Sequence, residues 1–163
     1  MNTLLFILLV GVGATAVMDT WSILRKSLLG IPPPNYGMVG RWIAHMTHGQ
    51  YRHESIAESP PKSGENMIGW TAHYLIGIAF SALLIGIWGE PWIQNPTLAP
   101  AIVVGILTVA APFLLMQPGM GAGIAASKTP RPNAARFQSL LTHAVFGIGL
   151  YVSGWAVSLF RSV

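Results

Sequence analysis

Four long apolar stretches alternate with more polar connections along the chain. They cover about residues 3–24, 67–88, 98–117 and 137–160. A helix needs about 20 mostly apolar residues to cross a bilayer core about 30 Å thick, and each stretch has that length. The pattern therefore predicts an all-α integral membrane protein built as a bundle of four transmembrane helices. We expect residues 1–163 to form a single membrane domain.

Glycine and proline indicate where these helices end. Proline runs at residues 32–34 and 60–61 interrupt the long connection, residues 25–66, and Asn95-Pro96-Thr97 offers a threonine cap to the third span. The glycine-rich run at residues 118–123 cannot be the interior of a regular spanning helix, so we expect a loop or a re-entrant turn there. Pro132-Asn133 then supplies a stop and a cap from which the fourth helix begins.

The long first connection contains a short amphipathic pattern. Apolar residues recur there at helical spacing opposite polar ones: Val39, Trp42, Ile43 and Met46 against Arg41, His45 and His48. A helix with one apolar and one basic face lies flat in the membrane interface. We therefore predict a cytoplasmic interfacial helix in this connection.

Composition narrows the class of protein further. The chain is 52% apolar and 9% charged, whereas soluble domains carry about a quarter charged residues. A soluble globular fold and a disordered chain are both excluded. The sequence has no cysteine, which also excludes disulfides, thiolate metal sites and cysteine nucleophiles.

The basic residues predict an orientation. Five Lys or Arg lie in residues 25–66 and three in residues 118–136, but none in the short connection at residues 89–97. Basic connections stay in the cytoplasm, so both termini should be periplasmic. The net charge of +4 is then mostly an orientation signal that contacts lipid headgroups, and we expect no nucleic-acid partner.

The second and fourth spans share a local pattern. Both contain His-x-x-x-Gly-Ile, beginning at His73 and at His143, and the first and third spans resemble each other more faintly. A duplication would make the chain two repeated helical hairpins of the same topology. A chance match between apolar helices is the alternative.

Three ionisable side chains lie inside the predicted spans, namely Asp19, His73 and His143. Counted from the cytoplasmic ends at 1.5 Å per residue, all three lie about 9–10 Å inside the boundary. Such groups are costly in lipid and usually face the bundle interior. We therefore predict that they converge in one layer, which Gln117 closes from the third span. The partner of Asp19 must come from another helix, and His73 and His143 are the candidates.

Each member of this layer also has a structural interpretation. Intramembrane histidines can act simply as interhelical hydrogen bonders, worth about 0.6–2 kcal/mol. Gly77 and Gly147 lie one turn beyond the two histidines. They serve either helix packing or the clearance of room for a flat ligand against the imidazoles.

The first connection also carries a loose cluster of His45, His48 and His53, with Glu54 and Glu58 nearby. Zinc takes three or four such ligands, but the spacing matches no standard metal motif. These histidines are weak metal candidates, and a solvated interfacial face is the alternative.

Several motifs of the chain resemble one known family. They are Gly-Ala-Thr-Ala-Val-Met-Asp at residues 13–19, Ile-Pro-Pro-Pro-Asn-Tyr at 31–36, Gly-Trp-Thr-Ala-His-Tyr at 69–74, Ala-Pro-Phe-Leu-Leu-Met-Gln-Pro at 111–118 and Thr-His-Ala-Val-Phe-Gly at 142–147. They resemble the bacterial membrane-protein family catalogued as domain of unknown function 2938. The resemblance implies a small bacterial inner-membrane protein. It implies no reaction, substrate, cofactor or functional residue.

Three functions remain open from the sequence. In the first, a transporter or relay component moves protons or metal ions through the layer of Asp19, His73 and His143, at the interface of a homodimer. In the second, His73 and His143 bind haem b or a metal in a redox protein. In the third, the chain is an accessory subunit of a larger membrane complex. No enzyme motif is present.

Overall fold

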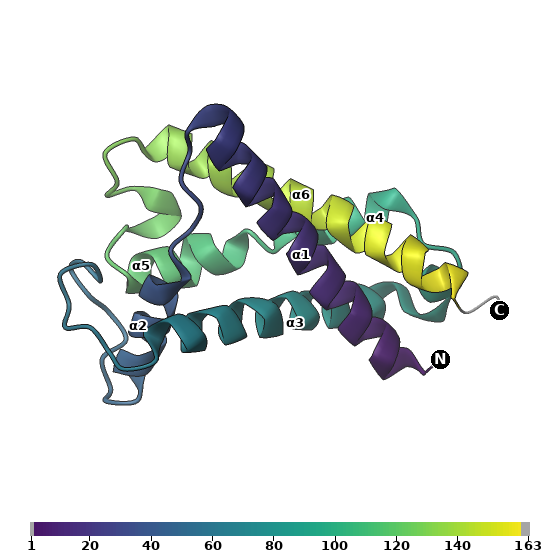
Figure 1. Cartoon of the computed structure of the whole chain (residues 1–163), viewed down its shortest axis with the longest axis horizontal. Coiled ribbons are helices and arrows are strands. Elements are labelled where there is room, and N and C mark those ends of the chain that lie inside the picture. Colours follow the sequence, from purple (N-terminus) through teal and green to yellow (C-terminus); the bar gives the residue numbers. More distant parts are fainter. Residues whose placement is uncertain (1, 161–163) are drawn as a thin grey trace. The chain divides into compact units, whose positions relative to one another are not determined.

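The computed structural model describes residues 2–160, and that range is all-helical with no strand. The elements are α1 Thr3–Leu29, α2 Tyr36–Met46, α3 Glu65–Gln94, α4 Leu98–Leu107, η1 Pro112–Met116, α5 Gln117–Gly119, η2 Ile124–Ala126 and α6 Pro132–Leu159 (Figure 1). Within the described range, four helical stretches are long and apolar enough to span a membrane: Thr3–Leu29, Glu65–Gln94, Leu98–Gly119 and Pro132–Leu159. The predicted all-α class with four spans is confirmed.

Helix α1 is longer than the sequence predicts. Its first turn is capped by Asn2, whose side chain accepts the N–H of Leu5 at 2.8 Å. It ends at Gly30, which has a φ of 66° and donates its N–H to the carbonyl of Lys26. Glycine takes up this left-handed conformation without strain. Arg25 therefore lies inside α1, not at the start of the connection, and only 5% of its surface is exposed.

The third span changes helix type at its proline. Pro112 has no N–H to donate, and residues Pro112–Met116 form a π-helix in which the N–H of Gln117 bonds to the carbonyl of Pro112. The disturbance expected at Pro112 thus appears as a local switch from i→i+4 to i→i+5 bonding.

The glycine-rich run that follows is irregular, as predicted. Gly121 and Gly123 have φ values of 95° and 74°. Ala125 and Ala126 also have positive φ, 47° and 59°, which costs roughly 1–3 kcal/mol for each such residue. The carbonyl of Ala125 accepts a 2.8 Å hydrogen bond from Nε of Arg136, and this bond helps to hold the strained turn.

The chain divides into two compact units, and α3 and α6 contribute residues to both. Within the described range, unit 1 comprises residues 2–33, 74–108 and 141–160, and unit 2 comprises residues 34–73 and 109–140. The single membrane domain stays a prediction.

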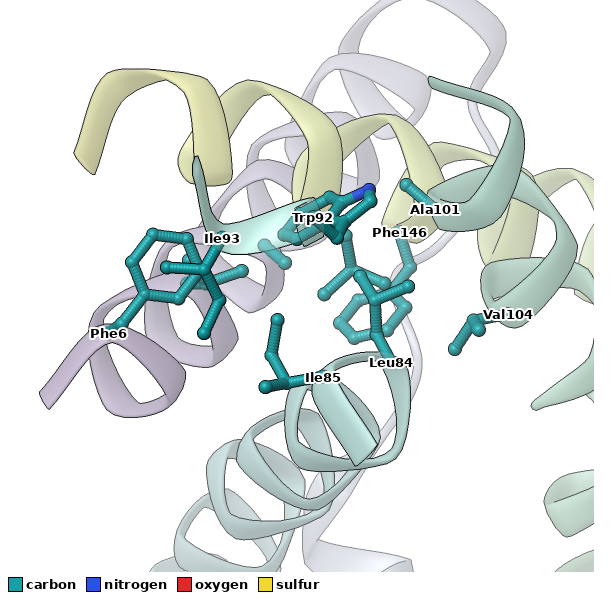
Figure 2. Packing of buried hydrophobic residues seen from close by; sticks show 11 residues of the cluster. Phe6, Leu84, Ile85, Trp92, Ile93, Ala101, Val104 and Phe146 are labelled. Atoms are coloured by element: carbon teal, nitrogen blue, oxygen red, sulfur yellow. The ribbon is translucent and has the colours of Figure 1, made fainter. Parts of the chain in front are cut away.

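Unit 1 has a continuous apolar core (Figure 2). Its buried side chains come from all four helices: Phe6, Val10 and Ala14; Leu84, Ile85, Trp92 and Ile93; Ala101 and Val104; Phe146 and Leu150. The rings of Phe6 and Trp92 meet edge to face at 6.3 Å. The amino-terminal end of α1 and the carboxyl-terminal end of α6 lie at the same end of this unit (Figure 1), as an even number of crossings requires.

Glycines bring the helices of unit 1 into backbone contact. A Cβ built on Gly11 of α1 would lie 2.5 Å from Cα of Ile78 in α3. A Cβ built on Gly105 of α4 would lie 2.6 Å from Cα of Gly147 in α6. Small residues at such crossings allow helices in lipid to gain close van der Waals contact.

The two crossings resemble each other in a further detail. Thr15 donates its hydroxyl to the carbonyl of Gly11 at 2.8 Å, and Thr108 donates to that of Gly105 at 2.6 Å. Each threonine thus follows the crossing glycine of the first helix in its hairpin. The offset differs, however, being four residues in the first pair and three in the second, and the repeated hairpins stay a prediction.

In unit 2, the expected helix within the first connection is present as α2. It crosses the start of α3 at two glycines, because a Cβ on Gly40 would lie 2.6 Å from the backbone nitrogen of Gly69. Arg41 pairs with Glu65 through two contacts, of 2.8 and 2.9 Å. The third guanidinium nitrogen donates to the carbonyls of Ile56, Ala57 and Ser59. The location of α2 in a membrane interface stays a prediction.

One face assignment on α2 is wrong. The sequence predicts His45 on the polar face, but His45 is 5% exposed and lies on the same buried side as Val39 and Trp42. These three residues are spaced three apart, so one side of a helix carries them all. The hydrophobic pattern alone therefore made the buried face of α2 too narrow and left His45 outside it.

Candidate functional site

Asp19 lies on α1 along a stripe of small and polar side chains. Gly11, Thr15 and Ser22 of this stripe are buried, and Asp19 is half-buried. The hydroxyl of Tyr74 in α3 donates to Oδ2 of Asp19 at 3.1 Å. A partner for Asp19 therefore comes from another helix, as expected, and it includes a phenol that the sequence analysis did not consider.

Tyr74 was available to sequence reasoning. It follows His73 directly and lies at the same depth in the second span. The sequence analysis considered only the histidines, because histidine titrates near neutral pH, and the structure adds the phenol of Tyr74. A tyrosine adjacent to an intramembrane histidine is the signal that could have found it.

His143 has a fixed structural partner. Its Nδ1 lies 3.0 Å from Oγ1 of Thr108, and that hydroxyl donates its proton to the carbonyl of Gly105. The hydroxyl therefore accepts from the imidazole, so Nδ1 carries the hydrogen and Nε2 keeps a lone pair. His143 thus joins α6 to α4.

Atoms of neighbouring helices fill the space beside Gly77 and Gly147, the glycines of the two His-x-x-x-Gly-Ile motifs. A Cβ on Gly77 would meet the hydroxyl of Thr15. A Cβ on Gly147 would lie 2.9 Å from the carbonyl oxygen of Ala101 and 3.0 Å from Cα of Ile102. Both glycines therefore serve helix packing, and the clearance of room for a ligand stays a prediction.

The other two members of the expected layer lie in unit 2. The ring of His73 stacks on that of Tyr36, with centroids 4.0 Å apart and planes at 23°, and meets Trp70 edge-on at 5.8 Å. Gln117 follows the π-helix, and its side-chain oxygen is buried with no hydrogen-bond partner. Asp19 and His143 belong to unit 1, and the convergence of all four residues stays a prediction.

The histidines of the first connection separate into a buried pair and an exposed residue. His45 and His53 are buried, and their rings meet edge to face at 4.9 Å. His48 lies beyond the end of α2, is exposed, and contacts Thr47. In the range that the structure describes, no three His, Asp or Glu side chains gather as a metal site would need.

An open groove of about 380 Å³ runs along unit 1. Its lining is almost wholly apolar and comes from α1 and one residue of α6: Ala16, Val17, Thr20, Trp21, Leu24 and Val145. Neither Asp19 nor His143 lines it, so this groove is not where the ionisable groups act.

A family model described as a protein of unknown function matches residues 8–157, nearly the whole chain. The chain belongs to the DUF2938 family. The match takes in the four candidate spans of this DUF2938 protein except for a few terminal residues. No curated protein and no solved structure matches it. What this DUF2938 protein does must therefore be argued from its own geometry.

Proposed function

We propose that this DUF2938 protein is a small bacterial inner-membrane component of proton-coupled transport, with Asp19 as its proton-binding group. The observation that carries this proposal is the 3.1 Å hydrogen bond between Tyr74 and Asp19 within two candidate spans. A carboxyl group inside a bilayer costs about 2.5–3.5 kcal/mol on insertion scales and usually belongs to an ion or proton pathway.

Asp19 and Tyr74 form a pair that can hold a proton in two ways. An ionised carboxylate only accepts, so the phenol donates to it. Once Asp19 is protonated, its hydroxyl can donate and the phenol oxygen can accept. The hydrogen bond thus reverses with the arrival of a proton, which is what a relay requires. His143, with a free lone pair on Nε2, and His73, next to Tyr74, are the further proton carriers in this proposal.

Four short helices enclose little volume, so we expect the path at an interface between two copies of the chain or with a larger membrane complex. The surrounding lipid bilayer covers the remaining apolar surface. A metal-ion relay has less support than a proton relay, because the described residues hold no cluster of three metal ligands.

The orientation of the protein gives a direct prediction. Both termini should be periplasmic, since eight Lys or Arg lie in residues 25–66 and 118–136 and none in residues 89–97. Alkaline phosphatase fused after Val163 should be active, and a cytoplasmic reporter at the same place should be silent. The reverse result would put both long connections outside and contradict the proposed orientation.

Replacing Asp19 by asparagine should abolish proton movement. The amide preserves the shape and one polar contact with Tyr74 but cannot take up a proton. In liposomes loaded with a pH-sensitive dye, an imposed potassium diffusion potential should drive protons through the wild-type protein. We expect Asp19→Asn to lower this flux by about tenfold or more, equivalent to about 1.4 kcal/mol or more in the barrier.

Thr20→Val is the matched control for this experiment. Thr20 is the next residue on α1, is exposed, and its hydroxyl donates back to the carbonyl of Ala16. Its loss removes a polar group at the same depth without touching the proposed relay, so the flux should stay unchanged. A wild-type flux no greater than that of empty liposomes would contradict the proposal.

The second candidate function is an accessory subunit of a larger membrane complex. It is favoured because several candidate groups already serve to hold helices together. His143 bonds to Thr108, and atoms of neighbouring helices fill the space beside Gly77 and Gly147. A haem beside His143 has less support, because atoms of α4 occupy the space beside Gly147. Folded protein without proton flux and without a Soret band would leave the accessory subunit as the better description.

A further inference from the structure

The two long connections are joined to each other in unit 2. The backbone N–H of His53 donates to the carbonyl of Gly119 at 2.9 Å, and that of Ile56 donates to Met120 at 3.1 Å. The backbone of Gly121 lies directly against the carbonyl of Glu54, where no side chain would fit. Residues 53–56 of the first connection therefore dock on residues 119–121 of the second.

Two buried histidines lie at the base of this junction. His45 and His53 are 5% and 8% exposed, and their ring centroids are 4.9 Å apart. Nε2 of His45 lies 3.0 Å from the carbonyl oxygen of Pro60, and since a carbonyl only accepts, this nitrogen carries a hydrogen. Nδ1 of His53 lies 2.8 Å from Oγ of Ser59 and 3.3 Å from the side-chain nitrogen of Gln50.

The surroundings of His53 suit a neutral ring and not a charged one. Its Nε2 is buried and has no hydrogen-bond partner. A protonated imidazole must donate from both nitrogens. The hydroxyl of Ser59 donates to the carbonyl of Ser55 and can accept from Nδ1, but Nε2 has no acceptor. A buried donor without an acceptor, carrying positive charge, is strongly unfavourable.

No neighbouring acid compensates a charge on His53. From α2, the ionisable groups on this side are His45 and Arg41, and Glu65 at the start of α3 is engaged by Arg41. The part of the second connection that docks there, residues 119–121, contains no titratable side chain. On the same segment as His53, Arg52, Glu54 and Glu58 are exposed.

We propose that His53 is the proton-sensitive element of a latch that joins the two long connections, closed when the ring is neutral and released when it is protonated. The latch consists of residues 53–56 and 119–121, with His45 behind His53. It responds to the pH of the compartment that the two connections face.

The direction of the response follows from the burial of the ring. Burial, and then the proximity of His45, lower the pKa of His53 from its ordinary value. The released chain takes up the proton at about pH 6.5, while the docked chain resists it. The latch is therefore fully stable above this pH and loses stability as the pH falls through and below it.

The test measures hydrogen exchange at the amides of His53 and Ile56, whose protons make the two bonds of the junction. Protection factors, corrected for intrinsic exchange, should fall by about tenfold for each pH unit below about 6.5, until the folded pKa is reached. His53→Gln, which cannot become charged, should remove this pH dependence. His48→Gln replaces an exposed histidine of the same connection and should leave it intact.

Two outcomes would overturn the latch. One is constant protection of both amides between about pH 7.5 and about pH 5. The other is the same fall in protection in His53→Gln as in the wild type. If His53→Gln lacks protection even at neutral pH, NMR titration of His53 in the wild-type protein is the test instead. The midpoint of His53 protonation must then coincide with the pH at which the protection of the two amides stops falling, and separate values contradict the proposal.

Discussion

Replacing Gly105 by alanine is expected to lower the free energy of unfolding of unit 1 by about 1–3 kcal/mol, the usual range for overpacking. The added Cβ would lie 2.6 Å from Cα and 2.7 Å from the nitrogen of Gly147. These are backbone atoms of α6 and cannot rotate aside, so α4 and α6 must separate. The bond between Thr108 and His143, one turn away, should weaken with them. Reversible unfolding in mixed micelles of mild detergent and SDS measures the change.

Gly86→Ala is the matched control, because it makes the same chemical change in a spanning helix. A Cβ on Gly86 has nothing within 4 Å. Alanine favours a helix over glycine by about 1 kcal/mol, so this variant should be as stable as the wild type or more so. If both variants lose the same stability, the close approach of α4 and α6 is not what Gly105 provides.

Replacing Trp42 by alanine is expected to destabilise unit 2 by about 3–5 kcal/mol, the usual range for truncating a buried aromatic side chain. Trp42 is 5% exposed, and its ring lies against the backbone of Gly119. Its Nε1 donates to the carbonyl of Tyr51 at 2.9 Å. One side chain thus joins α2 to both long connections. Hydrogen exchange at His53 and Ile56 reports the free energy of opening.

Two further variants separate packing from hydrogen bonding at this position. Trp42→Phe keeps most of the ring and loses the bond to Tyr51, so it should cost only about 1 kcal/mol for the bond, plus the smaller packing loss. Trp155 is 52% exposed, and Trp155→Ala should change stability by no more than about 0.5 kcal/mol in detergent. Equal effects of Trp42→Ala and Trp155→Ala would show that burial of Trp42 contributes little.

The candidate site was only partly accessible from the sequence. Asp19 stands out because a carboxyl group in a long apolar run is rare, and the polar stripe of α1 indicates which way it points. The sequence offers Tyr74 beside His73 as a further candidate partner, but only the structure shows that its hydroxyl bonds to Asp19. The role of Gly147 likewise depends on α4, a helix far away in the chain.

The two long connections show the same division. Helix α2 and the irregular run after Gln117 were predictable, because amphipathic spacing and glycine content are local properties. The burial of His45 and His53, and the docking of their segment on Gly119 and Met120, were not. They arise from contacts between segments more than sixty residues apart, for which a single sequence carries no local signal.

The sequence by itself determined that lipid surrounds this protein and how many spans it has. Both follow from the length of the apolar runs, and a bilayer imposes that length on any helix that crosses it. The residue types also explain why Gly30 ends α1 and why Pro112 interrupts regular α-helix, since these constraints belong to the residues themselves. The tertiary structure alone decided which atoms meet: Tyr74 with Asp19, Thr108 with His143, and His45 with His53. Helix rotation and crossing select these pairs, and packing among distant segments sets both.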